Sequence, residues 1–142
     1  MNKKLWLIKF ALFRTSWEEI VRRGIFILRG VKSPQSRNNL AAMSLGDPVL
    51  FYQSQKEQAV VGLMDVIRES YPDPTSADSS WLTCDFRPLE TFPHFVTLSE
   101  IKSNPLLREI SLIRQPRLAV MPLIPDHFKI ILNMAGISIS NS

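Results

Sequence analysis

The chain has almost no cysteine: Cys84 is the single one among its 142 residues. One cysteine can form neither an internal disulfide nor a cysteine-based metal site, so we expect a reducing compartment, the cytoplasm. Histidine is almost as scarce, since His94 and His127 are the only two and lie far apart in sequence. Neither histidine matches a metal-ligand spacing, so both are expected at the surface. The sequence therefore predicts no metal site and no cofactor.

Long apolar runs are missing as well. Residues 1–13 place Lys3 and Lys4 ahead of an apolar stretch, as a secretory signal does, but Lys9 interrupts that stretch. No small-residue cleavage site follows it. No apolar run approaches the roughly 20 residues that a membrane-spanning helix needs. We therefore expect neither a signal peptide nor a membrane protein.

The sequence also lacks the familiar motifs of catalysis. It contains no phosphate-binding glycine loop and no nucleophile-elbow pattern, and no pair of carboxylates is identified by spacing alone. Cys84 alternates with Leu82 and Phe86 on an apolar strand face, so we interpret it as a small buried hydrophobic residue. Several carboxylates could meet in space, but strand carboxylates are more often solvated or paired with arginines; these are Asp65, Glu69, Asp73 and Asp85. The chain is not expected to be an enzyme.

The composition that is present suits one folded domain over residues 1–142, with residues 137–142 as a frayed tail. Hydrophobic residues make up 45% of the chain and charged residues 21%, which is ordinary for a globular protein of this size. No internal repeat, low-complexity segment or long linker interrupts it. The net charge of +4 favours an anionic partner.

Hydrophobic periodicity and capping residues predict the secondary structure. The expected strands cover Leu5–Phe10, 48–54, 59–66, 81–87 and 117–123, with a short apolar run at 25–28. The expected helices follow the caps Ser16, Ser33 and Thr97 and the prolines Pro105 and Pro125, and Gly46 and Gly136 are expected to end two of them. Residues 71–80 are expected to form a loop, because Pro72 and Pro74 lack N–H donors.

This order of elements predicts an α+β fold. The strands are too few and too irregularly spaced for a sandwich, so a curved sheet or small barrel with helices over its openings fits best. On the strand at 48–54, Tyr52 and Ser54 are expected to share one face and Phe51 to lie on the other.

Several stretches match one family in order and spacing over nearly the whole chain. They are Trp6-Leu7-Ile8-Lys9, Gly30-Val31, Ser36-Arg37-Asn38-Asn39-Leu40, Met43, Gly46-Asp47, Phe51-Tyr52-Gln53-Ser54, Val61-Gly62, Tyr71-Pro72-Asp73-Pro74-Thr75, Trp81, Arg117-Leu118-Ala119-Val120, Pro122 and Met134-Ala135-Gly136. Together they resemble the EVE domain, a PUA-like family related in fold to the YTH readers of methylated RNA. The resemblance implies a small mixed β-barrel flanked by short helices.

The resemblance also implies a pocket beside the barrel that receives one flipped-out, modified base of DNA or RNA. Such a pocket needs faces that stack on a base, polar groups for its edge and cations for flanking phosphates. The matching positions supply all three kinds of group, which makes nucleic acid the expected partner. The candidate binding residues are Lys9, Arg37, Asn38, Tyr52, Ser54, Tyr71, Asp73, Trp81 and Arg117.

The chain departs from the family pattern at three places. Phe10-Ala11-Leu12 stands where the family carries Ser-Glu-Pro, Leu28 stands in place of a tryptophan, and Lys32-Ser33-Pro34 replaces Arg-Asn-Tyr. Apolar or small groups thus replace an aromatic wall and a polar reader of the base edge, so we expect an altered pocket. Two hypotheses follow: a non-catalytic reader of modified bases, or a small-molecule-binding or structural domain in which residues such as Arg37 and Asp73 only brace the fold.

Overall fold

The computed structural model describes residues 3–11, 15–55 and 57–137. This part of the chain forms six strands, which are β1 (Leu5–Phe10), β2 (Phe26–Ile27), β3 (Pro48–Gln53), β4 (Ala59–Pro72), β5 (Leu82–Thr97) and β6 (Val120–Leu123). Its helices are α1 (Trp17–Arg23), α2 (Pro34–Ala41), α3 (Leu98–Ser103), the 3-10 turn η1 (Pro105–Leu107), α4 (Ser111–Arg114) and α5 (Pro125–Met134). The predicted α+β class is confirmed.

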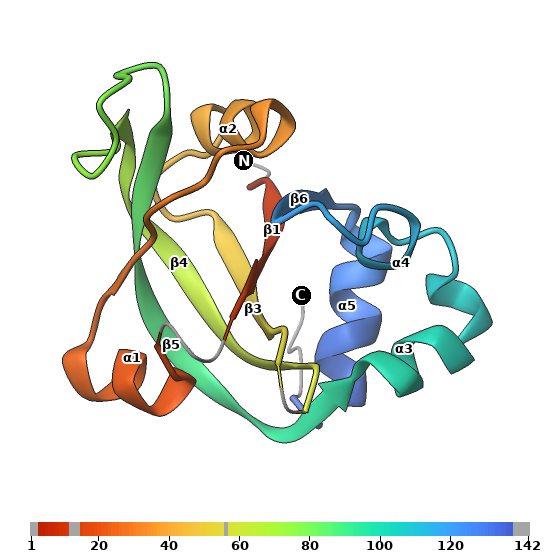
Figure 1. The fold of residues 1–142 in the computed structure, drawn as a ribbon. Helices are drawn as coiled ribbons and strands as arrows, with labels where there is room; N and C mark the ends of the chain where they lie inside the picture. Colours follow the sequence, from red (N-terminus) through yellow and green to blue (C-terminus); the bar gives the residue numbers. More distant parts are fainter. Residues whose placement is uncertain (1–2, 12–14, 56, 138–142) are drawn as a thin grey trace.

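The strands form one mixed sheet in the order β2-β5-β4-β3-β1-β6. β1 runs parallel to β3, and the other neighbours are antiparallel. The long strands β4 and β5 curve around one side of the molecule, with α2 at one end of the curve and α1 at the other (Figure 1). Among the described residues no pairing joins β2 to β6, so the sheet is strongly curved but does not close into the predicted barrel.

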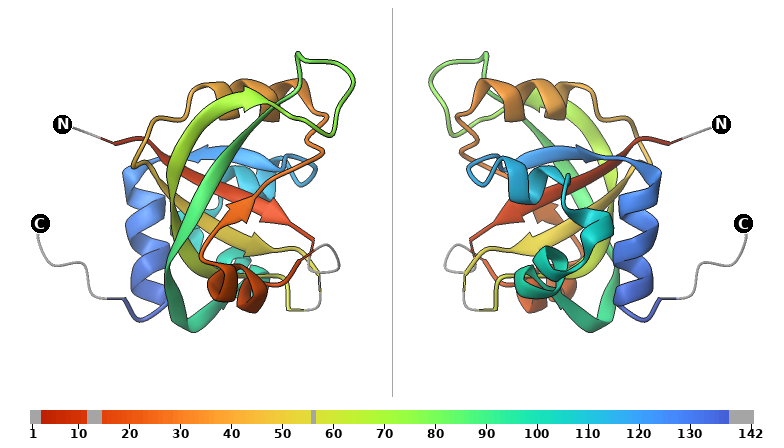
Figure 2. Two further views of the ribbon diagram at one scale, coloured as in Figure 1. Left: turned by 90° about the vertical axis from the view of Figure 1, so that its left-hand side faces the viewer. Right: turned by 90° about the vertical axis from the view of Figure 1, so that its right-hand side faces the viewer.

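Both faces of the sheet contribute side chains to a buried core. In β1, Trp6 and Ile8 belong to a core shared with α1 and α2, while Leu7 belongs to a second core shared with α3, α4 and α5. Figure 2 shows α3, α4 and α5 on the same side of the sheet. In β3, Phe51 and Tyr52 enter these two cores respectively. The two-residue period of the strands thus supplies both cores.

The structure corrects the predicted ends of several elements. α2 ends at Ala41, and Gly46 adopts its positive φ of 84° in the turn that follows the helix. Tyr71 and Pro72 pair with β5, so the predicted loop begins only after them. β5 continues to Thr97 through two prolines. Pro88 lies beside a register shift in the ladder with β4, where a missing donor is tolerated.

Other local predictions are confirmed. Ser16 accepts a hydrogen bond from the Glu19 backbone at the start of α1, and Thr97 and Glu100 form a capping box at the start of α3. Ile137, which was assigned to the frayed tail, donates its backbone N–H to Leu132. The rest of that tail and Leu12 lie outside the described residues. No helix in the described part of the chain is long and apolar enough to cross a membrane.

Candidate functional site

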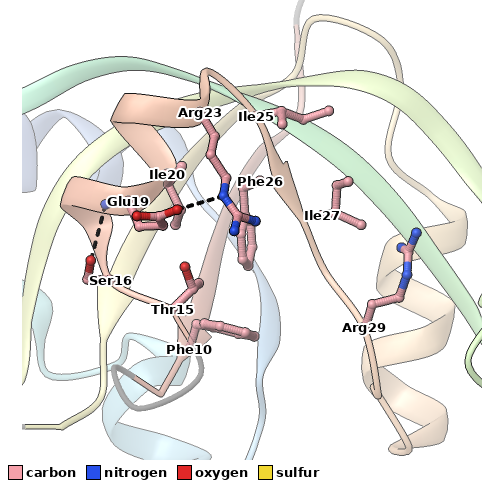
Figure 3. A pocket seen from close by; sticks show the side chains of 10 residues that line it. All are labelled: Phe10, Thr15, Ser16, Glu19, Ile20, Arg23, Ile25, Phe26, Ile27 and Arg29. Carbon is pink, nitrogen blue, oxygen red and sulfur yellow. Dashed lines mark hydrogen bonds and ion pairs between the residues drawn. The ribbon is translucent and has the colours of Figure 1, made fainter.

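Two cavities lie side by side, because Phe10 and Arg29 line both of them. The α1 cavity, of about 590 Å³, lies between α1 and β2 and is drawn in Figure 3. The β1 cavity, of about 460 Å³, lies between the end of β1, the segment 28–33 after β2 and the segment 117–119 before β6. Both volumes fall within the range of small-molecule sites, which is about 300–1,000 Å³.

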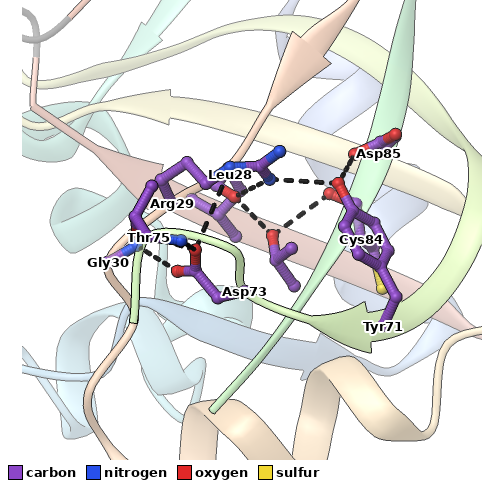
Figure 4. Close-up of polar contacts among 9 residues, drawn as sticks. Leu28, Arg29, Gly30, Tyr71, Asp73, Thr75, Cys84 and Asp85 are labelled. Carbon is purple, nitrogen blue, oxygen red and sulfur yellow. Dashed lines mark hydrogen bonds and ion pairs between the residues drawn. The ribbon is translucent and has the colours of Figure 1, made fainter. Parts of the chain in front are cut away.

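One wall of the β1 cavity is a segment without sheet pairing, Leu28 to Gly30, which side chains of the β4–β5 hairpin hold in place (Figure 4). The Thr83 hydroxyl donates to the Leu28 carbonyl, and Asp73 accepts the Gly30 N–H at 2.8 Å. Gly30 has a φ of 79°, a left-handed conformation that glycine adopts without strain. The hairpin therefore determines the shape of this wall.

The Asp73 carboxylate is fully buried behind the same wall. Burial alone would raise its pKa, but hydrogen bonds from Gly30 and Thr75 and the positive charge of Arg29 outweigh that effect, so the pKa of Asp73 lies below its ordinary value. Arg29 also donates to the Tyr71 hydroxyl, at 3.0 Å, and Tyr71 donates to Asp85. These contacts connect the wall to both long strands.

The opposite wall is held by backbone pairing. The Lys9 N–H donates to the Ala119 carbonyl at 2.8 Å, and the Ser54 N–H donates to the Phe10 carbonyl at 2.9 Å. The Lys9 ammonium donates to the Pro116 carbonyl, and partial burial lowers the pKa of Lys9. The lysine is thus held at the edge of the cavity, with its positive charge only partly solvated.

The chemistry of the β1 cavity is apolar and cationic. Its apolar lining comes from Phe10, Leu28, Val31, Leu118 and Ala119, and its hydroxyl groups come from Ser33, Ser36 and Ser54. Four cations line it, namely Lys9, Arg29, Lys32 and Arg117. None of the described residues that line it is acidic. Such a cavity can enclose a flat apolar ligand and attract negative charge at its rim.

Three of the nine candidate binding residues line this cavity: Lys9, Ser54 and Arg117. Tyr52 is only 2% exposed in the second core, and burial raises its pKa to about 12. The prediction that Tyr52 shares a strand face with Ser54 is wrong, because β3 ends at Gln53 and Ser54 turns to the cavity.

The other candidates lie outside the cavity. Tyr71 and Asp73 stand behind the wall described above. Trp81 packs beneath two cations, with Arg37 Cζ at 5.3 Å and Lys32 Nζ at 5.5 Å from its ring centre, and Asn38 follows Arg37 on α2. That these residues contact a ligand stays a prediction.

Two basic residues of the cavity were missed. Arg29 and Lys32 flank the Gly30-Val31 motif that carries part of the family resemblance, and both line the β1 cavity. Their position beside that motif could have identified them as candidate binding residues. Nothing in the spacing of the sequence indicated that the motif would form a cavity wall.

The histidines and the cysteine stand apart from the two cavities. His94 is exposed and contacts Glu100, which confirms its predicted surface position, and His127 is half-buried on α5. Cys84 is buried, as predicted, and burial raises the pKa of its thiol to about 12. Within the described residues, no group of three histidine, cysteine or acidic side chains could hold a metal ion. That the chain is not an enzyme stays a prediction.

Known proteins resemble this chain in sequence and in structure. It is 31% identical over 129 residues to human thymocyte nuclear protein 1, covering 74% of this chain and 57% of that protein. The chain therefore spans a little more than half the length of such curated relatives. A crystal structure of a protein from Agrobacterium tumefaciens superposes with a TM-score of 0.92 at 35% identity, covering 94% of each chain.

A further crystal structure is that of human THYN1 in complex with DNA containing 5-methylcytosine. It superposes with a TM-score of 0.87 at 26% identity and covers 96% of this chain and 100% of that one. The EVE domain matches residues 4–134, which include every strand and helix described above. The chain is a member of the EVE domain family.

Proposed function

We propose that this chain binds nucleic acid and holds one modified base, extruded from its strand, in the β1 cavity. The observation that carries the proposal is the lining of that cavity, which combines an apolar interior with four cations and no acidic residue among the described positions. The complex of human THYN1 with DNA containing 5-methylcytosine supports the same ligand class.

The cavity offers each interaction that an extruded base requires. Leu28, Val31 and Leu118 supply apolar contact, which compensates in part for the stacking that the base loses on leaving its strand. The hydroxyls of Ser33 and Ser54 reach the cavity and can bond to the polar edge of the base. Lys9 and Arg117 stand at its border, where they can contact flanking phosphates.

The departures from the family pattern fall on this cavity. Phe10 and Leu28 both line it, and Phe10, its only aromatic residue among the described ones, is 8% exposed. Little aromatic surface is therefore available beneath a base. An aromatic platform is worth roughly 1–3 kcal/mol per base, so we expect binding about tenfold to a hundredfold weaker than in a site with such a platform.

The test compares oligonucleotides that differ only in one base, 5-methylcytosine or cytosine, over a range of salt concentrations. Lys9→Ala and Arg117→Ala should each weaken binding about fivefold to tenfold at about 0.1 M salt, because each removes one phosphate contact. Arg114→Ala is the matched control, since Arg114 is also exposed and basic but pairs with Glu109. Its affinity should stay within about twofold of the parent.

A second variant tests the contact with the base. Leu28→Trp should add an aromatic surface to the cavity and tighten binding to the methylated oligonucleotide about tenfold. Because Leu28 is only 3% exposed, a melting temperature close to that of the parent is needed to establish that the fold accommodates the larger ring. Leu89→Trp, at an exposed position, controls for a general effect of added tryptophan. Binding that ignores both salt and the methyl group would refute the proposal and favour a compact neutral ligand.

A further inference from the structure

The α1 cavity has a composition of its own. Ile25, Phe26 and Ile27 form an apolar side, and Thr15 and Arg23 bring polar groups to it. Figure 3 shows Arg23 reaching from α1 into the space above Thr15 and Phe10. Since Phe10 also lines the β1 cavity, a ligand seated there has the α1 cavity as its immediate neighbour.

The two arginines of α1 both pair with Glu19, although the helix also carries a second acidic residue, Glu18. Glu19 accepts hydrogen bonds from both Arg22 and Arg23, so two guanidinium groups share one carboxylate. Hydrogen bonds from Arg22 and Arg23 hold the pKa of Glu19 below its ordinary value, which keeps the carboxylate ionised. Glu19 contacts Arg23 through Nε, at 2.7 Å. Within the described residues, the two terminal nitrogens of Arg23 donate no hydrogen bond, so they are available to an anion.

We propose that the α1 cavity binds the sugar and phosphate of the nucleotide next to the extruded base, with Arg23 as the phosphate ligand. The inference rests on the proposed function of the β1 cavity. A strand that inserts one base there must continue across an adjoining surface, and its next phosphate needs a cation within reach. The Thr15 hydroxyl is a second donor, and the apolar side suits the face of a sugar.

Arg22 provides a matched control for Arg23. The two residues are consecutive on α1, pair with the same carboxylate and have exposed fractions of 73% and 67%, but only Arg23 lines the cavity. Arg23→Ala should weaken binding to the methylated oligonucleotide about fivefold to tenfold at about 0.1 M salt. The slope of the logarithm of affinity against the logarithm of salt concentration should also become shallower by about the amount that one phosphate contact contributes. Arg22→Ala should change affinity less than about twofold.

Replacing the phosphate next to the modified base with a neutral methylphosphonate tests whether Arg23 contacts that phosphate. It should weaken binding by the parent protein about as much as Arg23→Ala does, and it should weaken binding by Arg23→Ala no further. Equal losses for Arg22→Ala and Arg23→Ala, or additive losses with the methylphosphonate, would overturn the inference. Melting temperatures of both variants establish that they fold.

The same experiment separates this inference from the proposed function. A parent protein that binds methylated and unmethylated oligonucleotides equally, yet depends on Arg23 and on that linkage, would refute base reading and leave the phosphate contact standing. A preference for the methylated base that does not depend on Arg23 would do the reverse. No binding to either oligonucleotide would overturn both.

Discussion

Replacing Asp73 with alanine removes the group that holds one wall of the β1 cavity. Its carboxylate accepts hydrogen bonds from the Gly30 N–H at 2.8 Å, from the Thr75 N–H at 2.8 Å and from the Thr75 hydroxyl at 2.7 Å. Hydrogen bonds to a charged group contribute about 1.5–3 kcal/mol each, but all three end on the same carboxylate and water can replace some of them. We expect the free energy of unfolding to fall by about 3–5 kcal/mol.

Urea denaturation measures this change, which corresponds to a drop in melting temperature of about 10–15 °C for a chain of this size. Asp78→Ala is the control, because Asp78 lies in the same loop and accepts the Ser80 N–H but is exposed. The control should have a much smaller effect. A loss below about 1 kcal/mol for Asp73→Ala would refute the bracing role.

The effect of Asp73 depends on pH in a defined direction. Its folded pKa lies below the unfolded value, which is about 3.9, so its contribution is complete above that pH and is lost as the pH falls through the folded pKa. The difference in stability between the parent and Asp73→Ala should therefore stay constant near neutral pH and shrink below about pH 4. A difference that grows as the solution is acidified would contradict this sign.

A wall that has lost Asp73 should also bind less well. If Gly30 and its neighbours shift, affinity for the methylated oligonucleotide should fall even at temperatures where Asp73→Ala is fully folded. Unchanged affinity under those conditions would show that the wall keeps its shape without Asp73.

Two further substitutions test the packing of the core. Gly62→Ala would place its Cβ 2.1 Å from the buried ring of Trp17, so we expect the free energy of unfolding, measured by urea denaturation, to fall by about 2–4 kcal/mol. A fall of less than about 1 kcal/mol would refute this close packing. Cys84→Ser should lower the free energy of unfolding by about 1–3 kcal/mol, because it buries a hydroxyl. The native thiol should react with a thiol-labelling reagent only when the protein unfolds, and rapid labelling of the folded protein would contradict its burial.

The sequence by itself determined the elements whose signals are local. The strand at Leu5–Phe10, the Ser16 and Thr97 caps and the helix that begins at Pro125 all follow from residues a few positions apart, and the structure confirms each of them. The family motifs likewise identified the family and the fold.

Tertiary structure decided the ends of the long strands and the members of the cavity. Pro72 lies in β4 because Leu82 pairs with it, and Pro88 lies in β5 beside a shift of register with β4. Tyr52 lies in the second core together with Leu7, a position that depends on packing across the sheet, so its predicted contact with a ligand stays a prediction.

The role of Asp73 shows the physical reason most clearly. Its motif predicted a ligand contact or a loop brace, and the choice depends on Gly30, which lies 43 positions away in sequence and donates to the carboxylate. Local patterns carry no information about such a partner, because a hydrogen bond between distant segments forms only when the sheet brings them together. Which residues line the two cavities is therefore a property of the folded chain, whereas the strands and helices that surround them could be predicted from the sequence.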